Sequence, residues 1–189
     1  MFVKICGITR EEDALLATAL GADAVGFVFA PSTRQVAVPI VRDIVRQLPA
    51  DIMTVGVFRD ESAKRVVEVV NGIGLRAAQL HGHETPEDCR WISERIPVTI
   101  RALAAGSPDL ERFDDFGAEL LLLDSPLPGS GEVFDWALAE GAPDNRQMIL
   151  AGGLDPTNVA SAIERVAPYG VDVSSGVESV PGRKDPRLL

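Results

Sequence analysis

The sequence has few residues of the types that bind metals or form disulfide bonds. Its 189 residues include two cysteines, Cys6 and Cys89, and two histidines, His81 and His83. Two cysteines make no disulfide framework of the kind that stabilises small secreted proteins. The histidines fit no common metal-ligand spacing with these cysteines. We therefore expect no metal site.

Long hydrophobic runs are also missing. No apolar run approaches the roughly 18 residues that a membrane span requires. Residues 1–13, MFVKICGITREED, reach charged residues almost at once. They lack the basic start, apolar stretch and small-residue cleavage site of a signal peptide. We expect a cytoplasmic protein with no membrane partner.

Positive charge is in deficit, with 18 Lys and Arg against 28 Asp and Glu and a net charge of −10. A surface this acidic repels phosphate backbones, so we expect no nucleic-acid partner. A small anion can still bind, but only in a local pocket lined by cations or backbone amides.

Apolar residues make up 46% of the chain and recur in eight short runs. Several runs are almost continuously apolar, which is typical of strands buried on both faces. Segments with helical periodicity separate them, with starts predicted at Asp60, Thr85–Pro86 and Asp155–Pro156. The runs are Phe2–Ile5, Ala24–Phe29, Met53–Phe58, Ala77–Leu80, Val98–Leu103, Leu120–Leu123, Met148–Ala151 and Val171–Val173.

Strands that alternate with helices predict a parallel sheet with right-handed crossovers. Eight strands suffice to close an α/β fold of the (β/α)8 TIM-barrel type, and an open doubly wound sheet is the alternative. The length suits one domain, and no low-complexity linker divides the chain. We therefore predict a single barrel domain over residues 1–189.

Active sites of parallel α/β folds lie at the carboxyl ends of the strands. The polar and glycine residues at these ends are therefore the candidate site residues, and a closed barrel would bring them to one mouth. They are Cys6, Arg34, Asp124, Gly152, Gly153, Asp172, Ser174, Ser175 and Gly176.

Two of these candidates can move protons. Cys6 is reactive as a thiolate, and the nearby Lys4 is expected to lower the pKa of its thiol. A small buried apolar role fits Cys6 equally well, whereas Cys89 lies inside a predicted helix and reads as structural. Asp124 directly follows an apolar run, so a partly desolvated carboxyl suited to general acid catalysis is favoured over a loop cap.

The last two strand ends suit a phosphate. Gly152 and Gly153 allow close approach of the backbone, and residues 174–176 offer hydroxyls and amides at a helix start, with Ser175 and Glu178 at capping-box spacing. The alternative is two ordinary turns, but loops after strands seven and eight are the usual phosphate site of such barrels. Arg34 suits a carboxylate or a solvated position, and the two histidines read as loop residues.

Several motifs carry a resemblance to a known family. Residues 4–9, KICGIT, resemble the N-terminal signature of phosphoribosylanthranilate isomerases. Residues 150–154, LAGGL, and 172–178, DVSSGVE, resemble the family's last two strand ends. Weaker likeness runs through residues 26–34, 55–58, 79–82 and 123–136, so that it covers nearly the whole chain.

The resemblance implies a cofactor-free Amadori rearrangement of N-(5-phosphoribosyl)anthranilate, with Asp124 as general acid and Cys6 as general base. Arg34 would bind the anthranilate carboxylate and Asp172 a sugar hydroxyl. Gly152, Gly153, Ser174, Ser175 and Gly176 would hold the phosphate, and the enzyme would be a monomer or homodimer. The chain departs from the family at Ser130 and in having no sequence for a full eighth helix after Asp185.

Two other functions stay open. A catalytically weak barrel that only binds a phosphorylated molecule would bind a product analogue without converting substrate. A dual-substrate sugar isomerase that also serves histidine biosynthesis would use two aspartates, and Cys6 at the end of the first strand disfavours it.

Overall fold

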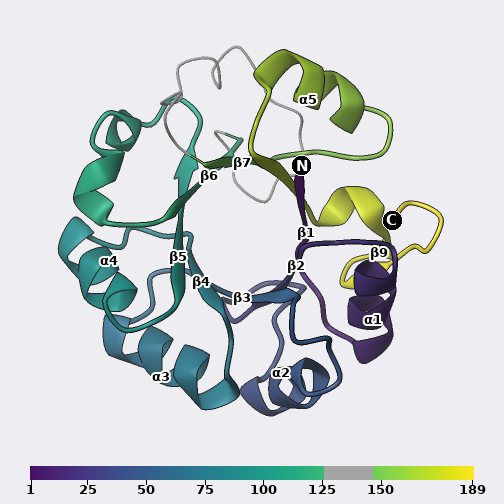
Figure 1. Ribbon diagram of the computed structural model, residues 1–189, viewed down its shortest axis with the longest axis horizontal. Helices are drawn as coiled ribbons and strands as arrows, with labels where there is room; N and C mark the ends of the chain where they lie inside the picture. Colours follow the sequence, from purple (N-terminus) through teal and green to yellow (C-terminus); the bar gives the residue numbers. More distant parts are fainter. Residues whose placement is uncertain (126–146) are drawn as a thin grey trace.

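A closed barrel of eight parallel strands forms the centre of the computed structural model, which describes residues 1–125 and 147–189 (Figure 1). Neighbours pair in sequence order, and β1 closes the ring by pairing with β8. The predicted barrel is confirmed, and the open sheet is wrong. The strands are β1 (Phe2–Ile5), β2 (Ala24–Val28), β3 (Met53–Phe58), β4 (Ala77–Leu80), β5 (Val98–Ala104), β6 (Leu120–Asp124), β7 (Met148–Leu150) and β8 (Gly170–Val173).

Alternate residues of each strand face opposite sides of the barrel wall. One set packs in the barrel interior, as Val55, Ala77 and Leu122 do. The other set, including Phe27 and Leu121, packs outward under the helices. Both faces of the wall are therefore apolar, which explains the continuous apolar runs in the sequence.

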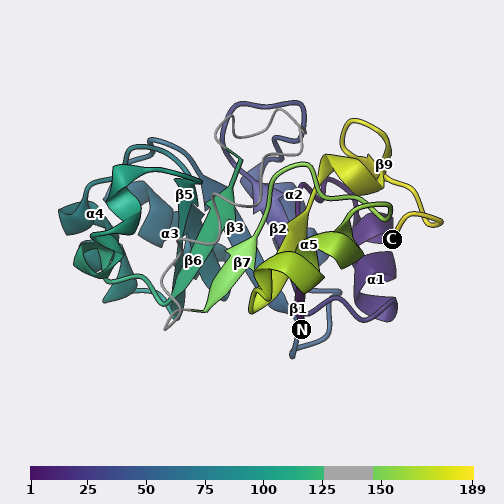
Figure 2. The same cartoon turned by 90° about the horizontal axis from the view of Figure 1, so that it is seen from above.

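Helices surround the ring of strands (Figures 1 and 2). Thr85 caps its helix as predicted, by accepting a hydrogen bond from the Asp88 amide, with Pro86 at the first helical position. The start predicted at Asp60 is wrong, because Ser62 caps α3. Asp155 accepts hydrogen bonds from the amides of Thr157 and Asn158, as a helix cap does, although the regular part of α5 begins at Val159. The helices are α1 (Glu11–Ala19), α2 (Val38–Val45), α3 (Ala63–Ile73), α4 (Pro86–Ser93) and α5 (Val159–Val166).

The connection from β5 to β6 contains two short 3-10 helices, η1 (Pro108–Leu110) and η2 (Phe113–Phe116), in place of an α-helix. Phe113 and Phe116 are both buried there. Two aromatic side chains thus cover this part of the wall with fewer residues than a full helix needs. The sixth unit of the family resemblance, with Ser130, lies mostly outside the described residues.

A hairpin follows β8 where the fold would usually place an eighth helix. The 3-10 helix η4 (Ser175–Val177) leads into β9 (Glu178–Val180) and β10 (Arg183–Lys184). Figures 1 and 2 show this segment beside α1. The Thr9 hydroxyl donates to the Gly182 carbonyl, and the Lys184 amide donates to Asp13. The predicted lack of an α-helix after β8 thus holds over the described residues.

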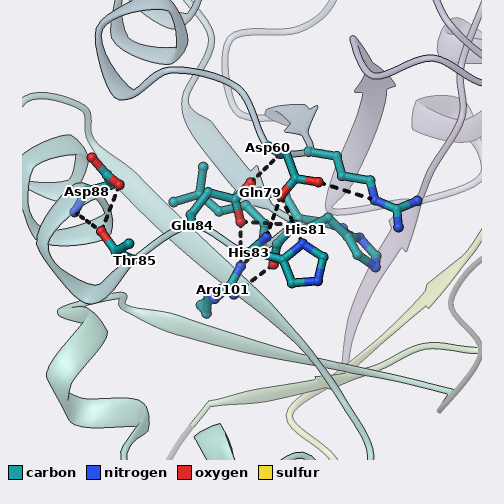
Figure 3. A network of polar contacts seen from close by, with 11 residues as sticks. Asp60, Gln79, His81, His83, Glu84, Thr85, Asp88 and Arg101 are labelled. Carbon is teal, nitrogen blue, oxygen red and sulfur yellow. Dashed lines mark hydrogen bonds and ion pairs between the residues drawn. The ribbon is translucent and has the colours of Figure 1, made fainter.

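One ion pair is buried on the outer side of the wall, between Arg101 of β5 and Glu84 of the β4–α4 loop (Figure 3). The Arg101 Nη1 lies 2.6 Å from the Glu84 Oε2, and both side chains are less than 5% exposed. Glu84 also accepts hydrogen bonds from the amides of Asp60 and Gly82. Asp60, predicted as a helix cap, instead binds His83 in this network. The pair therefore ties two neighbouring loops to the barrel.

None of the helices described, in residues 1–125 and 147–189, is long and apolar enough to cross a membrane.

We predict that Arg101→Met lowers the free energy of unfolding by about 3–5 kcal/mol, because it leaves the Glu84 carboxylate buried without a counter-charge. Urea denaturation followed by circular dichroism measures the effect. Arg46→Met is the matched control, since Arg46 pairs with Asp43 at the exposed surface and should lose less than about 1 kcal/mol. Equal losses in the two variants would contradict the prediction.

Candidate active site

A pocket opens at the carboxyl ends of the barrel strands, where the sequence placed the active site. Eight of the nine predicted site residues line it: Cys6, Arg34, Asp124, Gly152, Gly153, Asp172, Ser174 and Ser175. Gly176 is not among the lining residues. It instead packs so closely against the Leu154 carbonyl that a Cβ atom could not fit there.

Lys4 and Cys6 stand on the same side of β1, as their spacing predicted. A Cβ atom at Gly26 on the neighbouring strand would lie 2.8 Å from the Cys6 Sγ and 3.2 Å from the Lys4 Nζ. The Lys4 Nζ donates to the Asp172 Oδ1 at 2.9 Å, and Lys4 is fully buried. The pocket floor therefore consists of a thiol beside a buried ion pair.

The pKa of the Cys6 thiol is raised above its ordinary value, although Lys4 lowers it as expected from the sequence. Burial disfavours the thiolate most strongly, and the charge of Lys4 opposes this effect without overcoming it. Asp172 adds further repulsion. The thiol is therefore protonated at neutral pH, and a cation in a bound ligand would favour the thiolate.

Arg34 lines the pocket and belongs to a cluster of ion pairs with Glu178 and Lys184. Its Nε and Nη2 donate to the two carboxylate oxygens of Glu178 at 2.8 and 2.7 Å. The Lys184 Nζ donates to the same carboxylate at 3.0 Å and to the Ser174 carbonyl at 2.9 Å. Burial alone would raise the pKa of Glu178, but Arg34 and Lys184 hold it below its ordinary value. The capping role predicted for Glu178 is therefore wrong.

Two glycines shape the wall beside Asp124. Gly152 and Gly153 have φ values of +90° and +65°, which disfavour any residue with a side chain. A Cβ atom at Gly152 would also lie 2.7 Å from the Ser125 amide nitrogen and 3.0 Å from the Asp124 Oδ1. Ser174 and Ser175 lie across the same pocket, at the start of η4. The two strand ends thus meet as predicted for an anion site.

Sequence reasoning missed Gln79 and His81, which also line the pocket. The His81 Nε2 lies 3.2 Å from the Asp124 Oδ2, and the His81 Nδ1 lies 3.0 Å from the Gln79 Nε2. A signal was present, because residues 77, 79 and 81 alternate along one strand and Ala77 packs in the barrel interior. Polar residues at alternate positions after Ala77 therefore point into the mouth of the barrel.

No group of three or more His, Cys, Asp and Glu side chains in residues 1–125 and 147–189 comes together in a way that could hold a metal ion.

Comparison with known proteins decides the family. The model of the N-(5'-phosphoribosyl)anthranilate isomerase family matches residues 3–189. The chain belongs to this family. The isomerase from Desulforudis audaxviator is 48% identical over 99% of this chain and 93% of its own length. The isomerase from Thermotoga maritima is 47% identical over 97% of this chain and 92% of its own length.

Solved structures of other phosphoribosylanthranilate isomerases share the fold. The Thermus thermophilus enzyme superposes with a TM-score of 0.93 at 43% identity, covering 100% of this chain and 94% of its own. A further isomerase structure, also 43% identical over 100% of this chain and 94% of its own, has a TM-score of 0.87. That protein was solved in complex with reduced 1-(o-carboxyphenylamino)-1-deoxyribulose 5-phosphate.

We predict that iodoacetamide alkylates Cys6 slowly at neutral pH and that the rate keeps rising above pH 9, the ordinary pKa of a thiol. Only the thiolate reacts, and burial disfavours it. The Cys89→Ala variant isolates Cys6 for mass-spectrometric measurement. Cys6→Ser isolates Cys89, which is fully buried and does not line the pocket, so this thiol should react more slowly. A Cys6 rate that levels off by pH 8 would contradict the prediction.

Proposed function

We propose that the chain converts N-(5-phosphoribosyl)anthranilate to 1-(2-carboxyphenylamino)-1-deoxyribulose 5-phosphate by acid–base catalysis. The main support is that Cys6, which follows β1, and Asp124, at the end of β6, line one pocket. The same pocket carries the glycine and serine loops suited to a phosphate. Family membership at 48% identity supports the same reaction.

Asp124 acts first, as general acid. It gives its proton to the ring oxygen of the sugar, and the bond between C1 and this oxygen breaks. The nitrogen lone pair forms a C1–N double bond, so that the opened sugar is a cationic Schiff base. Asp124 is left as a carboxylate, which the Ser125 amide stabilises by donating to Oδ1 at 2.7 Å.

Cys6 acts second, as general base. Once the thiol has lost its proton to solvent, the thiolate takes the proton from C2 of the opened sugar, and the electrons of the C–H bond neutralise the cationic nitrogen. The resulting enolamine becomes the ketone when the Cys6 thiol gives a proton to C1 and the C2 hydroxyl gives its proton to the Asp124 carboxylate. The cationic Schiff base makes the C2 proton acidic and also favours the thiolate, so that the high pKa of the resting thiol is compatible with this role.

Binding groups surround the two catalytic residues. Gly152, Gly153, Ser174 and Ser175 hold the phosphate through backbone amides and hydroxyls. Arg34 binds the anthranilate carboxylate. Two of the three guanidinium nitrogens bind Glu178, and we propose that the third, Nη1, donates to the substrate carboxylate.

Asp172 lines the pocket and also has a partner that the sequence did not suggest. Its carboxylate binds Lys4, so we propose that it keeps this cation beside Cys6, with its second oxygen open to a sugar hydroxyl. Gly176 supports the phosphate loop through its packing against Leu154, and its role in binding the phosphate stays a prediction.

Three expectations from the sequence stay predictions: the cytoplasmic location, the lack of a cofactor, and the choice between monomer and homodimer. A Thermotoga maritima relative is described as dimeric, and its structure was solved as monomers generated from that dimer.

We predict that Cys6→Ser and Asp124→Asn each reduce turnover about 10²- to 10⁴-fold, the usual contribution of one positioned proton-transfer group. Loss of phosphoribosylanthranilate fluorescence measures turnover. Cys89→Ala is the control for Cys6 and should keep full activity. Binding of a reduced product analogue without turnover by the unmodified chain would favour the weak binding barrel instead.

We predict that Arg34→Lys raises KM for phosphoribosylanthranilate at least about tenfold, because lysine cannot bind Glu178 and a carboxylate through one planar fork. The same variant should not alter KM for the analogue built on aniline, which lacks the carboxylate. An equal rise with both substrates would show that Arg34 does not bind the anthranilate carboxylate.

A further inference from the structure

We propose that His81 is a positioning residue for the general acid, holding its Nε2–H group against the Oδ2 of Asp124. This inference rests on the proposed role of Asp124. Two contacts of the His81 ring support this proposal, one with Asp124 and one with Gln79. The hydrogen bonds that Arg101 makes to the backbone on both sides of His81 also support it.

Each oxygen of the Asp124 carboxyl group lies near one nitrogen atom. Oδ1 accepts from the Ser125 amide at 2.7 Å, and Oδ2 lies 3.2 Å from the His81 Nε2. The His81 Nε2 is buried and makes no well-aligned hydrogen bond with the described residues. Catalytic hydrogen bonds often tighten only when substrate binds, and a small turn of either side chain aligns this one.

Gln79 determines which nitrogen of His81 carries the proton. The amide Nε2 of Gln79 lies 3.0 Å from the His81 Nδ1 (Figure 3). With the amide nitrogen of Gln79 facing the ring, Nδ1 accepts, and we propose that the proton of the neutral ring lies on Nε2. Gln79 is almost fully buried, so water does not compete for this contact. The ring therefore presents a donor to Asp124.

Arg101 fixes the backbone that carries the ring. Its Nη1 donates to the Leu80 carbonyl at 3.0 Å, and its Nη2 donates to the Gly82 carbonyl at 2.9 Å. These carbonyls belong to the two residues that flank His81. The bond from Arg101 to Glu84 completes the clamp, as Figure 3 shows. The buried ion pair of Arg101 and Glu84, on the outer side of the barrel wall, thus positions His81 at the mouth of the barrel.

This arrangement suits the moment of proton transfer. The proton passes from Asp124 to the ring oxygen of the sugar, and a negative charge develops on the carboxylate. The Nε2–H group of His81 already points toward that charge and keeps its own proton throughout. A donor placed in advance stabilises developing charge without reorganisation. His81 also limits rotation of the carboxyl group.

Two substitutions at one position separate donation from packing. His81→Gln keeps an amide nitrogen near the place of Nε2, whereas His81→Met has similar bulk and no donor. We expect His81→Met to lower kcat about 10- to 100-fold with little change in KM, the range for a hydrogen bond to a charged group. We expect His81→Gln to restore most of that loss. Equal loss in both variants, or none in either, would overturn the proposal.

His83→Met is the matched control, since His83 lies in the same loop with its side chain 89% exposed and outside the pocket. It should keep the kcat of the unmodified chain. If the unmodified chain does not convert phosphoribosylanthranilate at all, the proposed function fails. If it does and His81→Met keeps full kcat, only this inference fails.

The tautomer gives a test that does not depend on activity or on how the variants fold. Two histidines make the nitrogen-15 imidazole spectrum simple, and His83→Met assigns it. We expect His81 in the unmodified chain to show a protonated Nε2 and a bare Nδ1 at neutral pH. Gln79→Glu should place a proton on Nδ1, because a carboxylate only accepts. A protonated Nδ1 in the unmodified chain would overturn the proposal.

Discussion

The closure of β8 onto β1 is the contact on which the rest of the molecule depends. It pairs Lys4 with Asp172 in register and joins the two ends of the chain into one wall. The same pairing carries the ion pair between these side chains. Without closure, Cys6 at the end of the first strand would not share a mouth with the residues that follow β8. Apolar residues on both faces of each strand make this ring the arrangement that buries them best.

Closure of the barrel also buries charged side chains, and each buried charge needs a partner of opposite charge. Lys4 and Lys184 have no exposed surface in their side chains, and each binds a carboxylate. These cations and Arg34 gather on one side of the pocket, although the whole chain carries a net charge of −10. A local site can thus attract an anionic sugar phosphate while the surface repels larger polyanions. The buried pairs favour one geometry of the site rather than adding much stability.

The strands and most of the pocket could be predicted because the governing rules are local and periodic. All eight apolar runs became strands, with ends that differ by at most one residue. Gln79, His81 and Glu178 escaped prediction because His81 meets Asp124, 43 positions away, and Glu178 meets Arg34, 144 positions away, while Gln79 acts through His81. The helix start at Asp60 failed because its carboxylate binds His83 in a tertiary contact.

The hairpin after β8 has a consequence for anything joined to the end of this protein. It supplies the carboxylate that aims Arg34 into the pocket. Its tip is held by Thr9 and its far strand by Asp13. A fused domain or purification tag that pulled this hairpin from α1 would therefore weaken recognition of the aromatic acid before it unfolded the barrel.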